Sequence, residues 1–221
     1  LSSSSAASDV YKRQPQAHYV CGTVGYAPYA LPGSQTLGDI IATTFGEGVD
    51  IVLLENHGVV TGAEGLLSAF QRFETLDFCA RTLIRARTVG DVRSLTDEEI
   101  ARARQRGKQL PKFNPKHHTT AELTLRKKIV DVVHRAYDQR LMTSTEGTVS
   151  ARVDADSFLI TPFGVDRKYL DIDDIVLIRK GRRERRKQPS RAVRLHMAVY
   201  GDHPNIGAII TAQCPSATAY S

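Results

Sequence analysis

Apolar positions along the chain fall into short continuous runs and into longer stretches with helical spacing. The clearest run covers residues 51–60 and begins Ile-Val-Leu-Leu, which predicts a strand buried on both faces. Asn56, His57 and Gly58 interrupt that run, and asparagine and glycine favour a tight turn. We therefore expect a strand that ends at His57 and holds one imidazole at its tip.

Helices are predicted from capping residues and from periodicity. Ser34 follows a loop of prolines and glycine and can cap a helix over residues 35–45. Residues 63–87 and 121–140 carry apolar side chains at helical spacing, which predicts one core-facing stripe on each helix. The first stripe comprises Leu66, Leu67, Phe70, Phe73, Leu76 and Leu83, and the second comprises Leu125, Ile129, Val132, Val133 and Ala136.

Strand-like segments dominate the second half of the chain. They cover residues 148–153, 157–161, 175–179 and 206–212, with a helix over residues 191–200 before the last of them. This irregular alternation of strands and helices predicts an α/β or α+β layer fold. Residues 88–120 are polar, and we interpret them as a linker with a short helix in which His117 and His118 are solvated.

Composition argues against a membrane protein and against a disulfide scaffold. No apolar run approaches the roughly 20 residues that span a bilayer, so we expect no membrane association. Cys21, Cys79 and Cys214 are widely spaced and odd in number, and they form neither a CxxC pair nor a disulfide framework. A reducing cytoplasm fits this use of cysteine best.

The formal net charge of +6 raises the question of nucleic-acid binding. Much of the excess lies in residues 180–187, a basic run that contains a glycine and follows a strand-like segment. A solvated hairpin turn with charged flanks explains this run. No aromatic residues interleave with the basic ones, so a stacking platform for bases is absent and no nucleic-acid partner is expected.

The two ends of the chain suggest a fragment. Residues 1–14 are low in complexity, lack a starting methionine and resemble translated adaptor sequence, so they are set aside from the fold. They also lack the basic and apolar regions of a secretory signal. At the other end the chain stops at Ser221, inside what the pattern indicates is the start of a helix.

His57 has two explanations when it is taken alone. One imidazole does not make a metal site, so a structural histidine bonded within the turn is the simpler explanation. The other explanation is a ligand-binding group, because such groups tend to lie at strand ends in α/β folds. Local sequence leaves both explanations open.

Several short motifs together resemble the class II aldolase/adducin family, and especially the zinc-dependent fuculose-phosphate aldolases and ribulose-phosphate epimerases. In the first half they are Ala27-Pro28-Tyr29-Ala30, Pro32-Gly33-Ser34 and Asn56-His57-Gly58, followed by the long helix. In the second half they are Gly147-Thr148-Val149-Ser150, Thr161-Pro162-Phe163-Gly164, Pro189-Ser190, Leu195-His196 and His203-Pro204.

The order of these motifs is reversed relative to a single family domain. Residues 15–87 resemble the C-terminal half of a first domain, and residues 121–221 resemble the N-terminal half of a second, degenerate one. Residues 88–120 would be the linker of a tandem protein sampled across its domain junction. The resemblance implies a three-layer α/β/α fold with a mainly antiparallel central sheet, present as two partial domains. The halves could also dock as one circularly permuted domain.

The resemblance further implies a zinc cofactor and one of its ligands. The family's third metal histidine corresponds to His57, and its other two come from a His-x-His at a strand end. Thr211 and Gln213 stand at that place here, and both are poor zinc ligands beside imidazole. Ala192 stands where the family has its catalytic carboxylate. No catalytic residue is therefore assigned, and the second copy is not expected to be a zinc aldolase.

The family's phosphate-binding elements are partly retained. Small hydroxyls and backbone N–H groups suit an anion because they donate hydrogen bonds at close range. Turn and cap chemistry would explain the same residues equally well. The candidate phosphate-binding residues are Gly147, Thr148, Gly164, Ser190 and Arg191.

The resemblance predicts a function for the parent protein and a rival to it. The parent would be a zinc-dependent aldehyde-lyase or epimerase that acts on a small phosphorylated sugar as a homo-oligomer. The fragment itself would be inactive, because a single imidazole cannot hold catalytic zinc. The rival is a non-catalytic assembly domain, as in adducin, in which the fold serves oligomer contacts.

Overall fold

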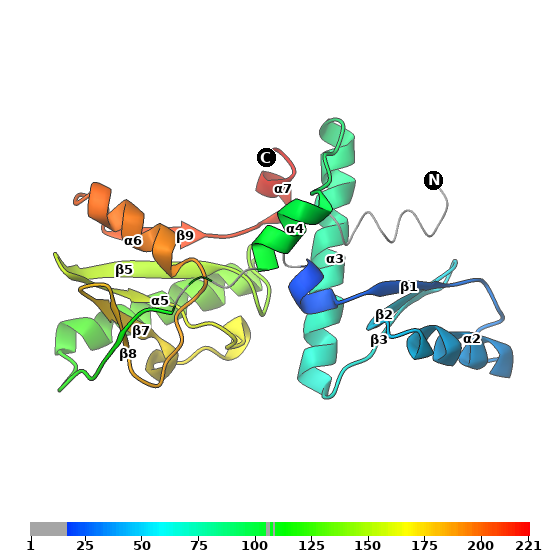
Figure 1. Cartoon of the computed structure of the whole chain (residues 1–221), viewed down its shortest axis with the longest axis horizontal. Helices are drawn as coiled ribbons and strands as arrows, with labels where there is room; N and C mark the ends of the chain where they lie inside the picture. The colour runs from blue at the N-terminus through cyan, green and yellow to red at the C-terminus, as the bar shows by residue number, and fades with distance from the viewer. Residues whose placement is uncertain (1–16, 105–106, 108) are drawn as a thin grey trace. The chain divides into compact units, whose positions relative to one another are not determined.

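The computed structural model describes residues 17–104, 107 and 109–221, in two compact units (Figure 1). Unit 1 comprises Leu1–Arg106 together with Pro215–Ser221, and unit 2 comprises Gly107–Cys214. The segment 1–14, which the sequence sets aside as adaptor-like, lies outside the described residues. Within the described ranges, no helix combines the length and the apolar character needed to cross a bilayer.

Unit 1 is built on a three-stranded sheet of order β1-β2-β3. Strand β2 pairs parallel with β1 and antiparallel with β3. The described elements of unit 1 are η1 (Ala17–Cys21), β1 (Val24–Ala27), α2 (Gln35–Gly46), β2 (Ile51–Leu54), β3 (Gly58–Thr61), α3 (Leu66–Val89), α4 (Asp97–Arg104) and α7 (Pro215–Thr218).

Helix α2 begins where the sequence predicts it. The Ser34 hydroxyl accepts a hydrogen bond from the Leu37 N–H at 3.2 Å, as an N-cap residue does. Leu37 is buried, and Ile40, Ile41 and Phe45 of the same helix pack against strand residues. The predicted cap and helix are therefore confirmed.

Side chains of β2 are divided between the two faces of its sheet. Val52 and Leu54 belong to a cluster with Phe45 of α2. Ile51 belongs to another cluster with Leu76 of α3. This division follows from the two-residue period of a strand. It explains why β2 is continuously apolar and confirms the prediction that the strand is buried on both faces.

The predicted core stripe of the long helix is only half correct. Leu76 and Leu83 on α3 are buried, as expected. Four other members of that stripe are exposed by 45% or more in the described structure, so their assignment to the core was wrong: Leu66, Leu67, Phe70 and Phe73. Helical spacing shows which residues share a face but not how far along the helix that face is covered.

Unit 2 contains a six-stranded sheet of order β4-β8-β7-β6-β5-β9. The pair β4-β8 is parallel and every other pair in this sheet is antiparallel. The described elements of unit 2 are β4 (Lys112–Phe113), α5 (Thr120–Asp138), β5 (Thr148–Asp154), β6 (Ser157–Ile160), η2 (Arg167–Tyr169), η3 (Ile172–Asp174), β7 (Val176–Arg179), β8 (Arg182–Glu184), α6 (Val193–Asp202) and β9 (Ala208–Thr211).

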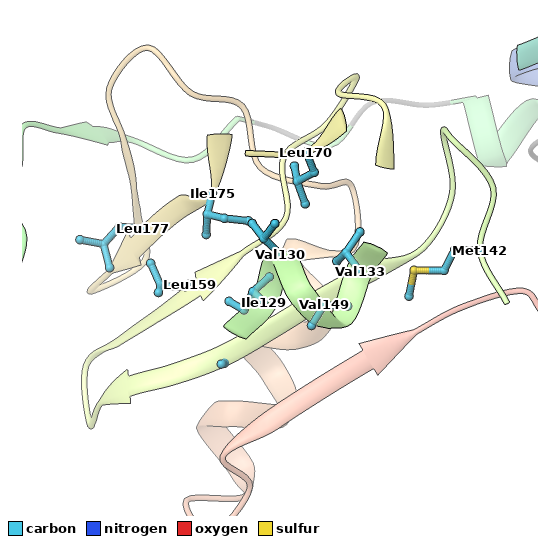
Figure 2. Packing of buried hydrophobic residues seen from close by; sticks show 10 residues of the cluster. Ile129, Val130, Val133, Met142, Val149, Leu159, Leu170, Ile175 and Leu177 are labelled. Carbon is cyan, nitrogen blue, oxygen red and sulfur yellow. The ribbon is translucent and has the colours of Figure 1, made fainter. Parts of the chain in front are cut away.

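Helices cover both faces of this sheet. On one face Ile129 and Val133 of α5 pack against Leu159 and Leu177, as Figure 2 shows. A second cluster on the other face joins two residues of α6, Val193 and Tyr200, to alternate residues of β6 and β7, namely Phe158, Ile160, Val176 and Ile178. The unit is therefore a mixed α/β fold with helix, sheet and helix layers and a mainly antiparallel sheet, as predicted. Val132 is an exception, because it is 40% exposed and not part of the core.

The basic run forms the hairpin that the sequence predicts. Strands β7 and β8 pair through Arg179 and Arg182, which leaves a two-residue loop of Lys180 and Gly181. Both loop residues have positive φ, 48° and 68°, as a type I′ turn requires. The turn is exposed at Lys180, which confirms the hairpin and its solvated turn, whereas Arg183 and Glu184 of the following strand are buried.

Candidate functional site

His57 lies in the turn of a hairpin between β2 and β3. Strand β2 ends at Leu54, three residues earlier than predicted, and Val59 and Val60 belong to the returning strand. Asn56 adopts a left-handed conformation with φ of 52°, which turns the chain. The His57 N–H donates to the Leu54 carbonyl at 3.2 Å, and its side chain is exposed.

The described side chains do not form a zinc site. Catalytic zinc needs three protein ligands, usually histidine, cysteine or a carboxylate. Within the described part of the chain, no group of three or more such residues is placed to hold a metal ion. Thr211 ends β9 with its hydroxyl 3.4 Å from His196 Nε2, and Gln213 follows the strand. The metal role of His57 stays a prediction.

Two of the candidate phosphate-binding residues contact each other. Thr148 Oγ1 and Ser190 Oγ lie 2.5 Å apart, and both residues are buried. The Ser190 hydroxyl also accepts from the Ala192 N–H at 3.3 Å, at the entry to α6. The Ser190 N–H donates to the Thr161 carbonyl at 3.0 Å. The two hydroxyls are therefore hydrogen-bonded to each other, and Ser190 also accepts a hydrogen bond from the turn before α6.

The two candidate glycines meet different constraints. Gly147 has φ of 99°, and a Cβ at this position would lie 2.4 Å from Met142 Sδ. Gly164 has φ of 75° but open space around it. Gly147 is thus required by both conformation and space, whereas Gly164 is required by conformation alone.

Arg191 is already engaged at the surface. Its guanidinium Nη2 lies 3.4 Å from Glu146 Oε1, and it stacks over the Phe163 ring at 5.7 Å. An incoming anion would compete with the Glu146 carboxylate for this guanidinium. Phosphate binding by the five candidates stays a prediction, with Arg191 and the backbone of the two glycine turns as the accessible donors.

A buried arginine, which sequence reasoning missed, joins these turns. Arg167 is 3% exposed and donates to the carbonyls of Gly147 at 3.1 Å, Pro162 at 3.1 Å and Val165 at 2.7 Å. Burial lowers the pKa of Arg167, and the charges of Glu146 and Asp166 act in the opposite direction. An arginine in a polar loop gives no local signal of burial, so the sequence could not have identified it.

A second buried network joins His196 and Tyr200 of α6 to Ser150 of β5 and lies beside Thr211 at the end of β9. His196 is completely buried, with Nδ1 2.7 Å from Ser150 Oγ, and Ser150 Oγ also lies 2.8 Å from the Tyr200 hydroxyl. Burial lowers the pKa of His196 to about 4, so the ring is neutral at neutral pH. The network contains two hydroxyls and an imidazole, all from buried residues, so it supports the packing of α6 on β5.

His118 is exposed, as the sequence interpretation expected, but its imidazole also contacts two carboxylates. Its Nδ1 lies 2.8 Å from Glu122 Oε1, and its Nε2 lies 3.7 Å from Glu184 Oε1. Arg126 joins the same two carboxylates, at 2.7 Å to Glu122 and 3.1 Å to Glu184. Two buried acids on α5 and β8 therefore hold His118, which spacing along the chain could not show.

Comparison with known proteins identifies the family. The family model described as "Class II Aldolase and Adducin N-terminal domain" matches residues 4–84 and 127–221, most of the chain. The chain therefore belongs to the class II aldolase/adducin family, as its motifs predict. The two matched segments contain His57 and all five candidate phosphate-binding residues.

Curated relatives include two aldolases of phosphorylated sugars. A 5-deoxy-D-ribulose 1-phosphate aldolase of Bacillus thuringiensis serovar kurstaki is 33% identical over 76 residues, 34% of this chain and 34% of the relative. An L-fuculose phosphate aldolase of Escherichia coli K12 is 35% identical over 98 residues, 44% of this chain and 45% of the relative. The chain thus spans between a third and a half of the length of these relatives.

A solved structure is similar over a comparable part of the chain. It is the L-fuculose 1-phosphate aldolase from Glaciozyma antarctica PI12, with 17% sequence identity and a TM-score of 0.38. The match covers 46% of this chain and 45% of that one.

Proposed function

We propose that the protein containing this chain is a zinc-dependent aldehyde-lyase that cleaves a small phosphorylated sugar. Family membership carries the proposal, and the two curated aldolases named above support the substrate class. A sugar phosphate needs an anion-binding surface. Arg191 and the turns at Gly147 and Gly164, which the buried Arg167 organises, supply donors for it.

This chain by itself is proposed to be inactive. His57 is the one residue for which the family resemblance implies a metal role, and the described residues bring no set of further ligands together with it. A neutral imidazole in an exposed turn binds zinc weakly without partners. The remaining ligands would belong to sequence outside this chain, so we derive no catalytic step from the residues present.

Metal analysis and an activity assay test both parts of this proposal. The purified chain should hold far less than one zinc per molecule and should not release aldehyde from L-fuculose 1-phosphate. The Escherichia coli L-fuculose phosphate aldolase serves as the positive control under the same conditions. Stoichiometric zinc with turnover in the chain would show that the inactive assignment is wrong.

The longer protein provides the second arm of the test. His57→Ala in that protein should abolish both zinc retention and cleavage, since a zinc ligand cannot be replaced by a methyl group. His203→Ala, an exposed histidine of unit 2, is the matched control and should retain both. Retention of zinc in the His57 variant would remove His57 from the site.

A non-catalytic assembly protein is the second candidate. Thr211, Gln213 and Ala192 occupy the positions where the family resemblance implies two metal ligands and a carboxylate. The structure shows Thr211 in contact with the buried His196, a packing role. Sedimentation of the longer protein, which we propose is a homo-oligomer, would support this candidate if assembly persists without zinc or activity.

We also propose a cytoplasmic location. No disulfide is present among the described residues, and Cys21 and Cys79 are buried in one apolar cluster. Burial raises the pKa of the Cys21 thiol to about 12, which keeps the thiol protonated and unreactive.

A further inference from the structure

A cavity lies at the edge of unit 2, where β4 and β8 are paired. Its volume is about 380 Å³, and the described residues that line it are Lys112, Phe113, Asn114, Arg182 and Arg185. Three of these side chains are cationic and none is acidic. The cavity therefore concentrates positive charge, which favours an anionic ligand.

The acidic residue next to this cavity does not neutralise it. Glu184 lies between Arg182 and Arg185 in the sequence but is buried. Its carboxylate contacts Arg126 Nη2 and Lys187 Nζ, each at 3.1 Å, and accepts from the Leu177 N–H at 3.2 Å. Burial opposes its charge, yet these donors hold the pKa of Glu184 below its usual range. The charge of Glu184 is therefore matched inside the unit.

Hydrogen bonds fix the Arg182 guanidinium and the backbone of Lys112 and Arg185 around the cavity. Arg182 Nη2 donates to the Lys112 carbonyl at 2.9 Å, and the Arg185 N–H donates to the Phe113 carbonyl at 2.9 Å. Among the described residues, neither the Lys112 ammonium nor the Arg185 guanidinium has an ion-pair partner. The backbones that carry these two cations are thus fixed, and their charges have no ion-pair partner among the described residues.

We propose that this cavity binds a small molecule that carries a diphosphate group. Three cations match the two to three negative charges of such a group better than those of a single phosphate. Arginine binds phosphate oxygens through two parallel N–H donors, and the Asn114 amide adds a neutral donor. The cavity volume lies within the range of small-molecule pockets. None of its lining residues belongs to the candidate phosphate-binding residues above, so this site is separate from the proposed function.

A nucleic acid suits the cavity less well. Single-stranded nucleic acids need aromatic side chains on which successive bases can stack along a basic groove. Phe113 is the one aromatic residue among the described lining residues. It is half-buried, with the Arg179 guanidinium 5.8 Å from its ring centre. The cavity offers charge for one compact anion and no platform for a chain of bases.

Calorimetric titration of the whole chain with inorganic pyrophosphate, ADP and adenosine tests this proposal. Pyrophosphate and ADP should bind saturably and adenosine should not. Tighter binding of ADP than of pyrophosphate would identify a nucleotide as the ligand type, and equal binding would identify the diphosphate group alone. The variant Lys112→Ala/Arg185→Ala should bind pyrophosphate at least about tenfold more weakly, because it loses two charge-assisted contacts.

The matched control is Lys127→Ala/Lys128→Ala, which removes the same charge from the exposed surface of α5. Its affinity for pyrophosphate should stay within about twofold of the parent chain at physiological salt, where distant charges are screened. Circular dichroism should show both double variants folded, since all four substitutions truncate exposed side chains. The hydrogen bond from the Arg185 N–H to the Phe113 carbonyl is also kept, because it involves only the backbone.

Four results would overturn the proposal. They are the absence of saturable pyrophosphate binding, equal losses in the two double variants, adenosine binding as tight as that of ADP, and oligonucleotide binding that pyrophosphate does not displace. If pyrophosphate does not bind saturably, the role left for the cationic side chains is to protect the edge strand β4 from pairing with a strand of another molecule.

Discussion

A single histidine makes the stability of unit 2 depend on pH. Burial lowers the pKa of His196 to about 4 in the folded chain, whereas an unfolded histidine has a pKa near 6.5. Between these two values the unfolded state binds more protons than the folded state. Stability therefore rises with pH from about 4 to about 6.5 and is independent of His196 above that window.

We predict that protonation of His196 costs about 3 kcal/mol of unfolding free energy when the pH falls from 7 to 4. Urea unfolding at several pH values measures this loss. His196→Gln should flatten the dependence in that window, while His203→Gln, an exposed change at the end of α6, should leave it intact. An imidazole that titrates near pH 6.5 by NMR would contradict the prediction.

The two turn glycines provide a second prediction at the residue scale. Gly147→Ala should cost roughly 3 kcal/mol or more, because it combines a left-handed backbone with a collision against Met142. Gly164→Ala should cost about 1 kcal/mol, because space is open and only the backbone conformation is strained. Thermal unfolding of the two variants compares these costs, and equal costs would show that Met142 moves aside.

The sequence could identify which residues form turns and helix caps, but not which polar residues are buried or contacted by distant segments. Ser34 was recognised as a cap from local chemistry, and turn chemistry was one of the two explanations kept for Gly147 and Gly164, since turns and caps depend on neighbours in the chain. The burial of Arg167 and the contact of His118 with Glu184 depend on groups far away along the chain, so both follow from the fold. Local patterns carry no information about such partners.

At the scale of elements, helix α3 shows that apolar residues at helical spacing are not all buried. Leu76 is 7% exposed and Leu67 is 52% exposed, although both belong to one predicted stripe. We predict that Leu76→Ala costs about 2–4 kcal/mol of unfolding free energy and that Leu67→Ala costs less than about 1. Urea unfolding measures both. A large loss in the Leu67 variant would show that the exposed end of α3 is covered in solution.

The hairpin around His57 shows how a strand boundary was misjudged. Residues 51–60 are apolar on both sides of the turn, so the pattern predicted one strand ending at His57. Two short strands pair there instead, with Val52 opposite Val60. The Asn-His-Gly sequence was recognised as a turn, but its function as a hairpin loop depends on pairing that periodicity does not show.

At the scale of the whole unit, Arg126 holds three parts of unit 2 together. Its guanidinium contacts Glu122 on its own helix, Glu184 on β8, and the Ile172 and Ile175 carbonyls of the segment before β7. We predict that Arg126→Ala costs about 3–5 kcal/mol, because it removes the buried guanidinium that both carboxylates share and leaves Glu184 with Lys187 alone as its cationic partner at 3.1 Å. Urea unfolding of the variant measures the loss.

Lys168→Ala is the control for that prediction. Lys168 pairs with Asp138 at 3.0 Å, but both side chains are about half exposed. Exposed ion pairs contribute less than about 1 kcal/mol, so the control should unfold close to the parent chain. If Arg126→Ala and Lys168→Ala lose the same unfolding free energy, the prediction is wrong, and the Glu122 and Glu184 carboxylates must be repacked or hydrated in solution.

Family and fold class could be predicted from the sequence, whereas the assembly of a site could not. Motif order indicated the family, and the family match confirms it. The alternation of strands and helices indicated a layered fold of strands and helices, and the family resemblance implied helices on both faces of a mainly antiparallel sheet, which unit 2 confirms. The engagement of Arg191 by Glu146 and of Thr148 by Ser190 required coordinates, because these partners lie about 45 and 42 residues apart.

Because the residues of β2 alternate between two faces, unit 1 is sensitive to the exact number of residues in this strand. Each residue of β2 faces either α2 or α3, in strict alternation. Removal of Val52 would shift every later residue of the strand to the opposite face, as a slip of one position always does. Removal of one residue from the loop between β3 and α3 would shift no pairing. Length is therefore constrained far more tightly in these four residues than in the loop that follows them.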